Sequence, residues 1–514
     1  MSINRRRFIT ASAASAAGIA MSSLPFVAMA NIKTEDVKLS WAKLFRNALI
    51  EKPWLSAFQS VASDSFSSQA HIQGKWPRDL LGTLYRNGPA RHEIGDFRYQ
   101  HWFDGDGMLQ AFRMTPKGVF HQGKMIQTNK YQAEKAAGRA LYPAFGSVPP
   151  NPAPVTGPNI MNVGNINVLP HNGKLLALWE GGSPWDMDPD TLDTKGLFSF
   201  SPETKGLPFS AHPKVEEDGT LWNFGYVSYA NLIVLWHINS KGKVVKMGKV
   251  SADPISMPHD FIVTKNHIVL MMPPLHFQAG KMSSFLGAHQ WQSDQATRLL
   301  VVDKNDFSQY KWLELPSQWV FHFGNGWEDK SGVIRFDGAR SEDPLNMTSK
   351  FSDVMRGKMS AGSVTRPYQY RIDTKKWTVS EVPLMVSHIQ TEFPVIDPRV
   401  SCQRYRRIVM LSKNDNTPAV HAEYNEVSSF DLETGLRDFY RYPDSQIPEE
   451  HLFVAKPGSA PETKGWVIGT AHDWQQGTTL LNVFDVEAVA AGPIACATLP
   501  YTLPLGLHGK FVAS

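Results

Sequence analysis

The sequence predicts an all-β fold, and three observations carry that prediction. Short apolar runs recur along most of the 514 residues, turn-forming stretches separate them, and glycine and proline are plentiful at 38 and 35 residues. Short strands at even spacing with repeated turn signals are typical of an all-β meander. At this length a β-propeller is the natural closed form, because radial repetition leaves few exposed strand edges. No strict period is visible, so the number of blades does not follow from the residues alone.

The expected strands are short, and most are aliphatic. They cover residues 175–179, 197–200, 231–235, 268–272, 299–302, 368–372, 408–411 and 466–469. Turn-type stretches rich in Asp, Thr, Lys and Gly lie between them, as at 190–196, 373–376 and 431–435. Two segments read as helices instead, 37–46 and 130–139.

The first thirty residues predict an export signal. Three arginines at 5–7 precede a small-residue, moderately apolar stretch that ends in Ala-Met-Ala at 28–30. A charged start, an apolar stretch and a small-residue cleavage site define a secretory signal peptide. The arginine pair, one further residue and then Phe-Ile resemble a twin-arginine signal. We expect the twin-arginine export machinery to carry the protein to the periplasm, with the mature chain starting near Asn31. An ordinary secretory signal or an uncleaved anchor is the alternative.

Residues 31–514 are then expected to form a single domain. The 52 basic and 48 acidic residues give a net charge of +4, and no long run of Lys or Arg occurs, so nothing indicates nucleic-acid binding. After the leader no apolar segment is long enough to predict a transmembrane helix. The two cysteines, Cys402 and Cys496, are too few for a thiolate metal site. They are expected either to pair or to remain buried thiols.

Two long irregular segments interrupt the strand pattern. One spans 142–159 and is rich in Pro and Gly, and the other spans 271–291 and is apolar. Irregular insertions of this length inside a compact fold are usually functional. We expect them to line a hydrophobic tunnel or to rest on a membrane surface. Ordinary loop packing is the alternative.

Four of the 17 histidines stand in unusual sequence contexts. They are His212, His259, His322 and His508. The last lies in a rigid apolar tail, 499–509, at a position where chains usually fray. Imidazole is a ligand for iron, copper, zinc and nickel. We interpret the four as ligands of one metal ion around which the fold closes, although no local spacing such as His-x-x-x-His links them.

Three acidic residues are candidate partners of these histidines. Glu180, Glu392 and Glu450 lie beside apolar strand residues, where an unpaired carboxylate is costly. A metal-binding histidine commonly donates its other ring N–H to a carboxylate. The alternative for each acid is a strand end that faces water. His101, among aromatic residues, is expected to be an ordinary core histidine.

Two motifs carry a resemblance to a known family. Residues 85–90 read Tyr-Arg-Asn-Gly-Pro-Ala, and residues 101–109 read His-Trp-Phe-Asp-Gly-Asp-Gly-Met-Leu. With the four histidine contexts, the chain from about Gly74 to Phe511 resembles the carotenoid cleavage oxygenase family. The resemblance implies a seven-bladed β-propeller capped by loops and helices. It also implies one Fe(II) ion on the propeller axis, held by the four histidines, with the three glutamates behind them.

The reaction that this resemblance implies is cleavage of a carbon–carbon double bond by O2, giving two carbonyl products. No catalytic residue beyond the iron centre is expected, and Asp104 and Asp106 of the second motif are assigned to turn and packing roles. The motif block and the stretch Ala133–Arg139 resemble the apocarotenoid-type bacterial members. We therefore expect a hydrophobic alkene substrate, a carotenoid or apocarotenoid, and peripheral membrane contact is a further expectation.

Two alternatives remain open at this point. In the branch of the family that cleaves stilbenes and related phenylpropenoids, a lysine and a tyrosine engage the substrate phenol, and Lys130 and Tyr99 are the candidate substrate contacts here. A propeller binding protein without catalysis is a remote alternative, which the four intact ligand contexts disfavour. The stretch 321–328 departs from the commoner family pattern at two small residues and one aromatic residue. It is expected to alter the cavity wall.

Overall fold

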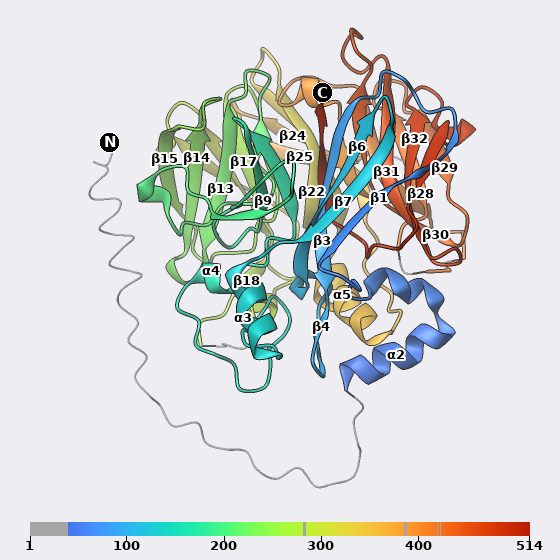
Figure 1. The fold of residues 1–514 in the computed structure, drawn as a ribbon. Helices are drawn as coiled ribbons and strands as arrows, with labels where there is room; N and C mark the ends of the chain where they lie inside the picture. The colour runs from blue at the N-terminus through green and yellow to red at the C-terminus, as the bar shows by residue number, and fades with distance from the viewer. Residues whose placement is uncertain (1–39, 281–283, 385–387, 419, 422) are drawn as a thin grey trace.

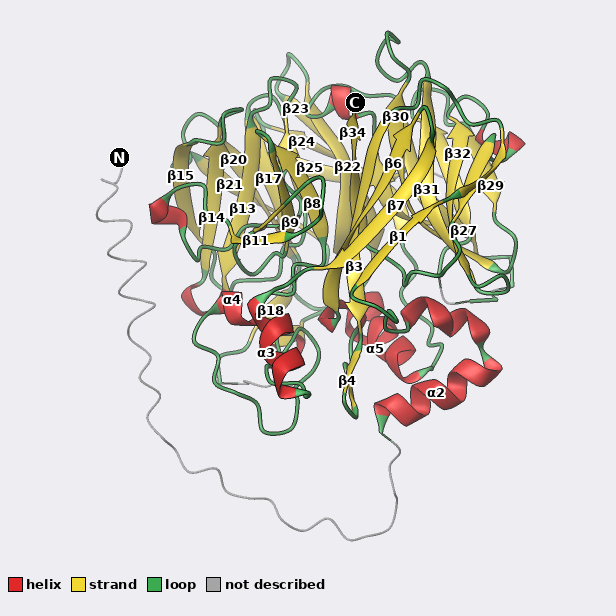
Figure 2. Ribbon diagram, viewed as in Figure 1, coloured by secondary structure: helices red, strands yellow, loops and turns green. Residues whose placement is uncertain are grey.

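Seven sheets arranged around a central axis make up the body of the protein, and the helices gather at one end of them (Figures 1 and 2). The computed structural model describes residues 40–514 except 281–283, 385–387, 419 and 422. The expected signal peptide at 1–30 lies outside the described residues. The arrangement confirms the prediction of an all-β, seven-bladed propeller with a cap of loops and helices.

Each large sheet is antiparallel, with four or five strands. The first contains β1 (Ser65–Gln69), β7 (Gly118–Met125), β6 (Asp106–Thr115), β3 (Gly82–Arg91) and β34 (His508–Ala513). The second contains β11 (Thr194–Leu197), β10 (Trp185–Met187), β9 (Lys174–Leu178) and β8 (Asn167–His171). The third contains β12 (Lys214–Val215), β13 (Leu221–Val227), β14 (Leu232–Ile238) and β15 (Val244–Ser251).

The remaining sheets follow in chain order. The fourth contains β16 (Phe261–Val263), β17 (His267–Met272), β20 (Thr297–Asp303) and β21 (Tyr310–Leu315), and the fifth β22 (Trp319–Glu328), β23 (Val333–Ser341), β24 (Arg366–Asp373) and β25 (Thr378–Pro383). The sixth contains β26 (Ile389–Val395), β27 (Arg407–Asn414), β28 (Glu426–Asp431) and β29 (Arg437–Arg441). The seventh contains β30 (Gln446–Ala455), β31 (Gly465–Asp473), β32 (Thr478–Asp485), β33 (Ala495–Thr498) and β2 (His71–Gly74).

The cap is built from short elements. Its helices are α2 (Trp41–Glu51), α3 (Asn129–Ala137), α4 (Pro158–Met161) and α5 (Phe351–Asp353), and its hairpins are β4 (Glu93–Ile94) with β5 (Phe97–Arg98) and β18 (Leu275–Phe277) with β19 (His289–Trp291). The side chain of Ser40 caps α2 by accepting from the Lys43 amide. The helix ends at Glu51, beyond the end of the expected helix at 37–46, and residues 37–39 lie outside the described residues. Thr128 and the left-handed Gly138 bound α3, close to the expected 130–139.

Blade packing explains why the strands read as continuous apolar runs. In β17 the side chains of Ile268, Leu270 and Met272 pack into the core toward the third sheet. Val269 and Met271, on the opposite face, pack into the core toward the fifth sheet. Because successive side chains of a strand point to opposite faces, a strand buried between two blades needs apolar residues at every position.

One expected strand, 197–200, is mostly absent. Strand β11 ends at Leu197, and the rings of Phe198 and Phe200 then lie 4.9 Å apart and pack into the central core. Ring packing rather than strand pairing therefore accounts for these apolar residues. Both cysteines are free thiols, Cys402 buried and Cys496 partly buried, so they do not pair. In the described part of the chain, no helix has the length and apolar character needed to cross a membrane.

Strands from opposite ends of the chain close the ring twice. In the first sheet, β34 pairs with β3 from Gly82 opposite Ala513 to Asn87 opposite His508. In the seventh sheet, β2 pairs with β33. The apolar tail at 499–509 is therefore held in the interior, as predicted, and delivers His508 to the axis.

Candidate metal centre and cavity

The propeller axis is lined by the strands that contact one another from sheet to sheet. Strand β34 contacts β8, β16 contacts β22, β22 contacts β26, β26 contacts β30, and β30 contacts β34. His322 lies in β22 and His508 begins β34, whereas His212 and His259 each lie two residues before an axial strand, β12 and β16. Four different sheets therefore each bring one histidine toward the axis.

The four predicted histidines meet as one buried group. Their candidate ligand atoms all lie within 4.8 Å of one another. The Nε2 atoms of His212 and His259 are 2.9 Å apart. The centroids of the His212 and His508 rings are 4.7 Å apart, and those of His322 and His508 are 4.8 Å apart. In the described part of the chain, this group has the composition and spacing to hold one metal ion.

The three predicted glutamates each bind one of these histidines. Nδ1 of His259 lies 2.7 Å from Oε2 of Glu180, and Nδ1 of His322 lies 2.6 Å from Oε2 of Glu392. Nδ1 of His508 lies 2.8 Å from Oε1 of Glu450. A carboxylate only accepts, so each Nδ1 carries the proton and each Nε2 keeps its lone pair. Three lone pairs are thus available to a metal ion at the centre.

Burial favours the uncharged form of two of the four histidines, His212 and His508. It lowers the pKa of His212 well below its usual value and lowers that of His508 to about 4. Burial also acts to lower the pKa of His322, but the charge and hydrogen bond of Glu392, together with the charges of Asp260 and Glu450, raise that pKa overall. Burial alone would raise the pKa of Glu450, but His508 and Arg86 bring it down to about 2. Neutral imidazoles are the form that binds a metal ion.

Unpartnered nitrogen atoms in the four-histidine group also fit a metal ion. In the described chain, Nε2 of His322 is buried without a hydrogen-bond partner. The His212 amide donates to the Ser210 hydroxyl, and no described carboxylate is bonded to the His212 ring. Buried polar atoms without partners are costly. A cation at the centre would satisfy the inward-facing nitrogens together.

The first sequence motif supports this centre, a role that sequence reasoning did not assign. Arg86 is buried and bonds Glu449 at 2.9 Å and Glu450 at 3.3 Å. Asn87 accepts from the Leu507 amide and is the register partner of His508. Arg86 and Glu450 are separated by 364 residues, so no local pattern could have linked them.

Gly88 leaves room for the apolar tail at 499–509 to pack against β3. A Cβ atom on Gly88 would lie 2.3 Å from the Cα of Gly506. Real Cβ atoms do not approach backbone this closely, so a larger residue would push the tail away from β3. In this motif Arg86 binds Glu450, Asn87 pairs with His508 in the sheet, and Gly88 leaves room for Gly506 of the tail.

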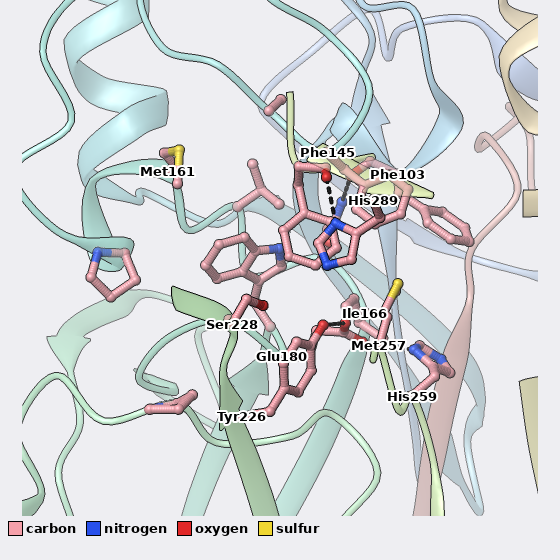
Figure 3. A pocket seen from close by; sticks show the side chains of 18 of the residues that line it. Phe103, Phe145, Met161, Ile166, Glu180, Tyr226, Ser228, Met257, His259 and His289 are labelled. Carbon is pink, nitrogen blue, oxygen red and sulfur yellow. Dashed lines mark hydrogen bonds and ion pairs between the residues drawn. The ribbon is translucent and has the colours of Figure 1, made fainter. Parts of the chain in front are cut away.

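A cavity of about 2170 Å³ opens over the histidines. His259, His322 and His508 line it together with Glu180 and Glu392. Its walls are largely apolar and aromatic, including Phe103, Phe145, Phe285, Trp319, Phe321 and Phe393. Figure 3 shows Glu180 and Tyr226 together beside Met257 and His259, with Phe103, Phe145 and His289 above them in the view. The size and chemistry of the cavity suit a large apolar molecule.

Both irregular segments contribute to the cavity wall, as one of the two expectations had it. The first supplies Phe145, Val148 and all of residues 152–159. The second supplies Phe277, Phe285 and His289, although its central part, 281–283, lies outside the described residues.

Lys130 and Tyr99, the candidate substrate contacts, lie elsewhere. Neither lines the cavity. Both are fully buried, and Nζ of Lys130 bonds the Tyr99 hydroxyl at 2.5 Å, Glu134 at 2.9 Å and Asp106 at 3.2 Å. Lys130 forms ion pairs with Glu134, one turn along the same helix, and with Asp106 of β6. The structure therefore gives the pair a packing role between α3 and β6 instead of a contact with the cavity.

The two aspartates of the second motif have the structural roles expected of them. Asp106 pairs with Arg91 at 2.7 Å and with Lys130. Asp104 accepts from the Gly146 amide and the Ser147 hydroxyl and so fixes the first irregular segment. Burial raises the pKa of Asp104 to about 6. His101, bonded to the Met347 carbonyl at 2.7 Å, is a buried core residue as expected.

The expectation of an altered cavity wall at 321–328 does not hold for the residues that differ. Phe321 and His322 line the cavity, whereas Gly324, Gly326 and Trp327 do not. A Cβ atom on Gly324 would meet Asp337 at 2.4 Å, and one on Gly326 would meet Ile262 at 2.3 Å. These glycines are required for packing of β22 against its neighbours.

Comparisons with known proteins agree with this geometry. Residues 58–513 match the family described as retinal pigment epithelial membrane protein. Apocarotenoid-15,15'-oxygenase of Synechocystis sp. is 28% identical over 89% of this chain and 96% of its own. Lignostilbene-alpha,beta-dioxygenase isozyme III of Sphingomonas paucimobilis is 28% identical over 86% of this chain and 92% of its own.

A solved structure matches over nearly the same span. The crystal structure of cobalt-substituted Synechocystis apocarotenoid oxygenase superposes with a TM-score of 0.81, at 27% identity, over 90% of this chain and 98% of that chain. Because the family match spans most of the chain, this protein belongs to the retinal pigment epithelial membrane protein family, the carotenoid cleavage oxygenases.

Proposed function

We propose that this protein is an Fe(II)-dependent dioxygenase that uses O2 to cleave a carbon–carbon double bond of a carotenoid or apocarotenoid to aldehydes. The observation that carries the proposal is a buried four-histidine group, three members of which line a large and largely apolar cavity. The relative named apocarotenoid-15,15'-oxygenase supports the substrate class.

His212, His259, His322 and His508 would hold the iron, with Glu180, Glu392 and Glu450 fixing three of the rings. When bound, the iron supplies the redox chemistry with O2. The protein itself binds and orients the alkene against aromatic walls, excludes water, and keeps three imidazole protons on Nδ1. No side chain in the cavity is assigned proton transfer to the substrate.

A second candidate is cleavage of a stilbene or related phenylpropenoid, and one observation favours it. A lignostilbene dioxygenase is as similar to this chain as the apocarotenoid oxygenase is, at 28% identity. Against it stands the position of Lys130 and Tyr99, which are buried away from the cavity. We rank the polyene first for that reason.

Export by the twin-arginine pathway and residence in the periplasm are also part of the proposal, supported by the arginine run at 5–7 and the small-residue stretch at 28–30. Peripheral membrane contact is supported by three exposed apolar residues that also line the cavity. Val148 is 37% exposed, Val155 40% and Tyr229 66%. Clustered exposed apolar residues are typical of membrane or ligand contact.

The test is to load the protein with Fe(II), incubate it in air with an apocarotenal and resveratrol together, and identify the products by mass spectrometry. A shortened apocarotenoid aldehyde is the expected product. Hydroxybenzaldehydes instead would establish the second candidate. Absence of both from a preparation with one iron per chain would contradict the polyene and the stilbene assignments alike.

A further inference from the structure

The cavity contains a second group of ionisable side chains, separate from the histidines. Lys350 ends the helical turn at Asn346–Lys350, and Glu423 and Tyr424 lie just before β28. All three line the cavity. Nζ of Lys350 lies 3.3 Å from Oε1 and 3.4 Å from Oε2 of Glu423. The Lys350 and Glu423 side chains are 11% and 12% exposed. Because both residues line the cavity, their accessible atoms face the cavity.

The charges in this group do not balance. Lys413 of β27 places its Nζ 5.7 Å from the Tyr424 ring, and burial together with the charge of Lys350 lowers the pKa of Lys413 to about 8. Asp415, the other nearby acid, is already paired with Arg366. Two ammonium groups therefore share one carboxylate, Glu423.

Lys350 also has unused donors. An ammonium group has three N–H donors, and both contacts with Glu423 are at the long end of hydrogen-bond range. In the described part of the chain, no other acceptor is hydrogen-bonded to Nζ of Lys350. A ligand oxygen placed here would accept from the free donors of Lys350 in a largely apolar cavity.

A continuous aromatic wall connects this group with the metal centre. Phe351, next to Lys350, has its ring 5.3 Å from that of Phe103, which lies 6.0 Å from Phe321. The Phe321 ring is in turn 4.3 Å from that of His259. A long molecule lying along this wall would reach both the charged group and the four histidines.

We propose that Lys350 and Glu423 bind an oxygenated end of the alkene substrate and so determine which double bond lies over the histidines. A carbonyl end group accepts from Lys350, and a hydroxyl accepts from Lys350 and donates to Glu423. The substrate class is thus a conjugated alkene with a carbonyl or hydroxyl at one end. This inference rests on the proposed function, and it assigns the two residues to positioning, not to catalysis.

The experiment compares two substrates of equal length, an apocarotenal and the polyene that carries a methyl group in place of its aldehyde. Wild-type protein should cleave the aldehyde with the higher kcat/KM, at one bond. Lys350→Met should lower kcat/KM for the aldehyde by about 10- to 100-fold, the range of a hydrogen bond to a charged group, and leave the hydrocarbon unchanged. Its aldehyde products should also include chains of other lengths, read by mass spectrometry.

Two control variants accompany it. Lys249→Met removes an ammonium group that also lines the cavity but is exposed on β15. This variant should leave kcat/KM unchanged for both substrates. Lys350→Arg retains the donor and should retain most of the preference for the aldehyde, which a purely structural role would not require. Iron content and thermal unfolding are measured for each variant, so that loss of folding is seen directly.

The outcomes separate this inference from the proposed function. Equal kcat/KM of the wild type for both substrates, or an equal loss for both in Lys350→Met, would overturn the end-group site and leave the proposed function standing. If neither substrate is cleaved, the proposed function fails. The end-group site is still decided then by the Kd of the aldehyde, read from its absorbance shift, which must weaken at least tenfold in Lys350→Met.

Discussion

Three of the four histidines at the axis have their outer ring nitrogen tied to a glutamate, and His212 is the exception. A carboxylate bound at Nδ1 fixes the tautomer and the ring orientation before a metal ion arrives. Glu450 is fixed in turn by Arg86 and by the Gly509 amide. At this scale the arrangement predicts that the glutamates control metal affinity without contacting the metal.

Glu450→Gln should therefore weaken iron binding by about 10- to 100-fold, the usual effect of removing such a partner. The amide cannot serve His508, Arg86 and Gly509 as the carboxylate does. Competition with a chromogenic chelator gives the affinity. The matched control is Glu426→Gln, since Glu426 is also buried and bound to an arginine, Arg437, but on the sixth sheet. Equal iron affinity in the Glu450 variant and in the control would contradict the role of Glu450.

Residue-scale interpretation from sequence succeeded where a motif itself carries the chemistry. The contexts of His212, His259, His322 and His508 identified a set that the structure brings together. It failed where the side-chain partners of a residue decide its role. Lys130 has Glu134 and Asp106 as partners, and the sequence gives no sign that they would turn it away from the cavity. Lys350 and Glu423 were missed because nothing local distinguishes them from surface charges.

At the scale of elements, β3 and the tail that leads into β34 depend on each other. Gly88 of β3 lets Gly506 approach, and the Asn87 carbonyl accepts from the Leu507 amide. The order of residues in the motif follows from this contact. Arg86, whose side chain holds Glu450, and Asn87, whose carbonyl binds the tail, are adjacent in the sequence.

Gly88→Ala should lower the free energy of unfolding by about 1–3 kcal/mol, the range for forcing an added methyl group into a packed site. It should also reduce the iron content, because the displaced tail carries His508. Denaturant unfolding and metal analysis provide the two readings. Gly157→Ala is the control, since a Cβ atom there meets nothing within 4 Å. A Gly88 variant with unchanged stability and full iron would show that the tail adjusts freely.

Element boundaries were predictable where turn chemistry is explicit. Asp373 and Asp431 each cap the turn that follows them, and both turns were expected from the sequence. The stretch 197–200 misled, because an aromatic run that packs as a loop has the same composition as a strand. The number of blades was accessible only through the family resemblance, because the sheets share packing and no sequence period.

For the whole molecule, a metal ion at the centre would link four different sheets through their imidazoles. Its four candidate ligands come from the strands or strand approaches of the first, third, fourth and fifth sheets. A ligand that binds only the folded state stabilises it in proportion to its occupancy. Metal binding should therefore raise the free energy of unfolding of the complete propeller.

Removing the iron with a chelator should lower the melting temperature, because at an iron concentration 1,000 times Kd the bound ion contributes about 4 kcal/mol. Differential scanning calorimetry with and without chelator measures the shift. His322→Ala, which removes one ligand from β22, should melt at a temperature that the chelator barely changes. A chelator-dependent shift as large in that variant as in the wild type would contradict the placement of the metal.

The closure of the ring by β34 has a consequence for biosynthesis. His508 is translated 186 residues after His322 (508 minus 322), and β34 follows every other described strand. While a ribosome is still making the seventh sheet, the nascent chain has three of the four imidazoles and an open first sheet. The four-histidine site can therefore be completed only after β34 has been made.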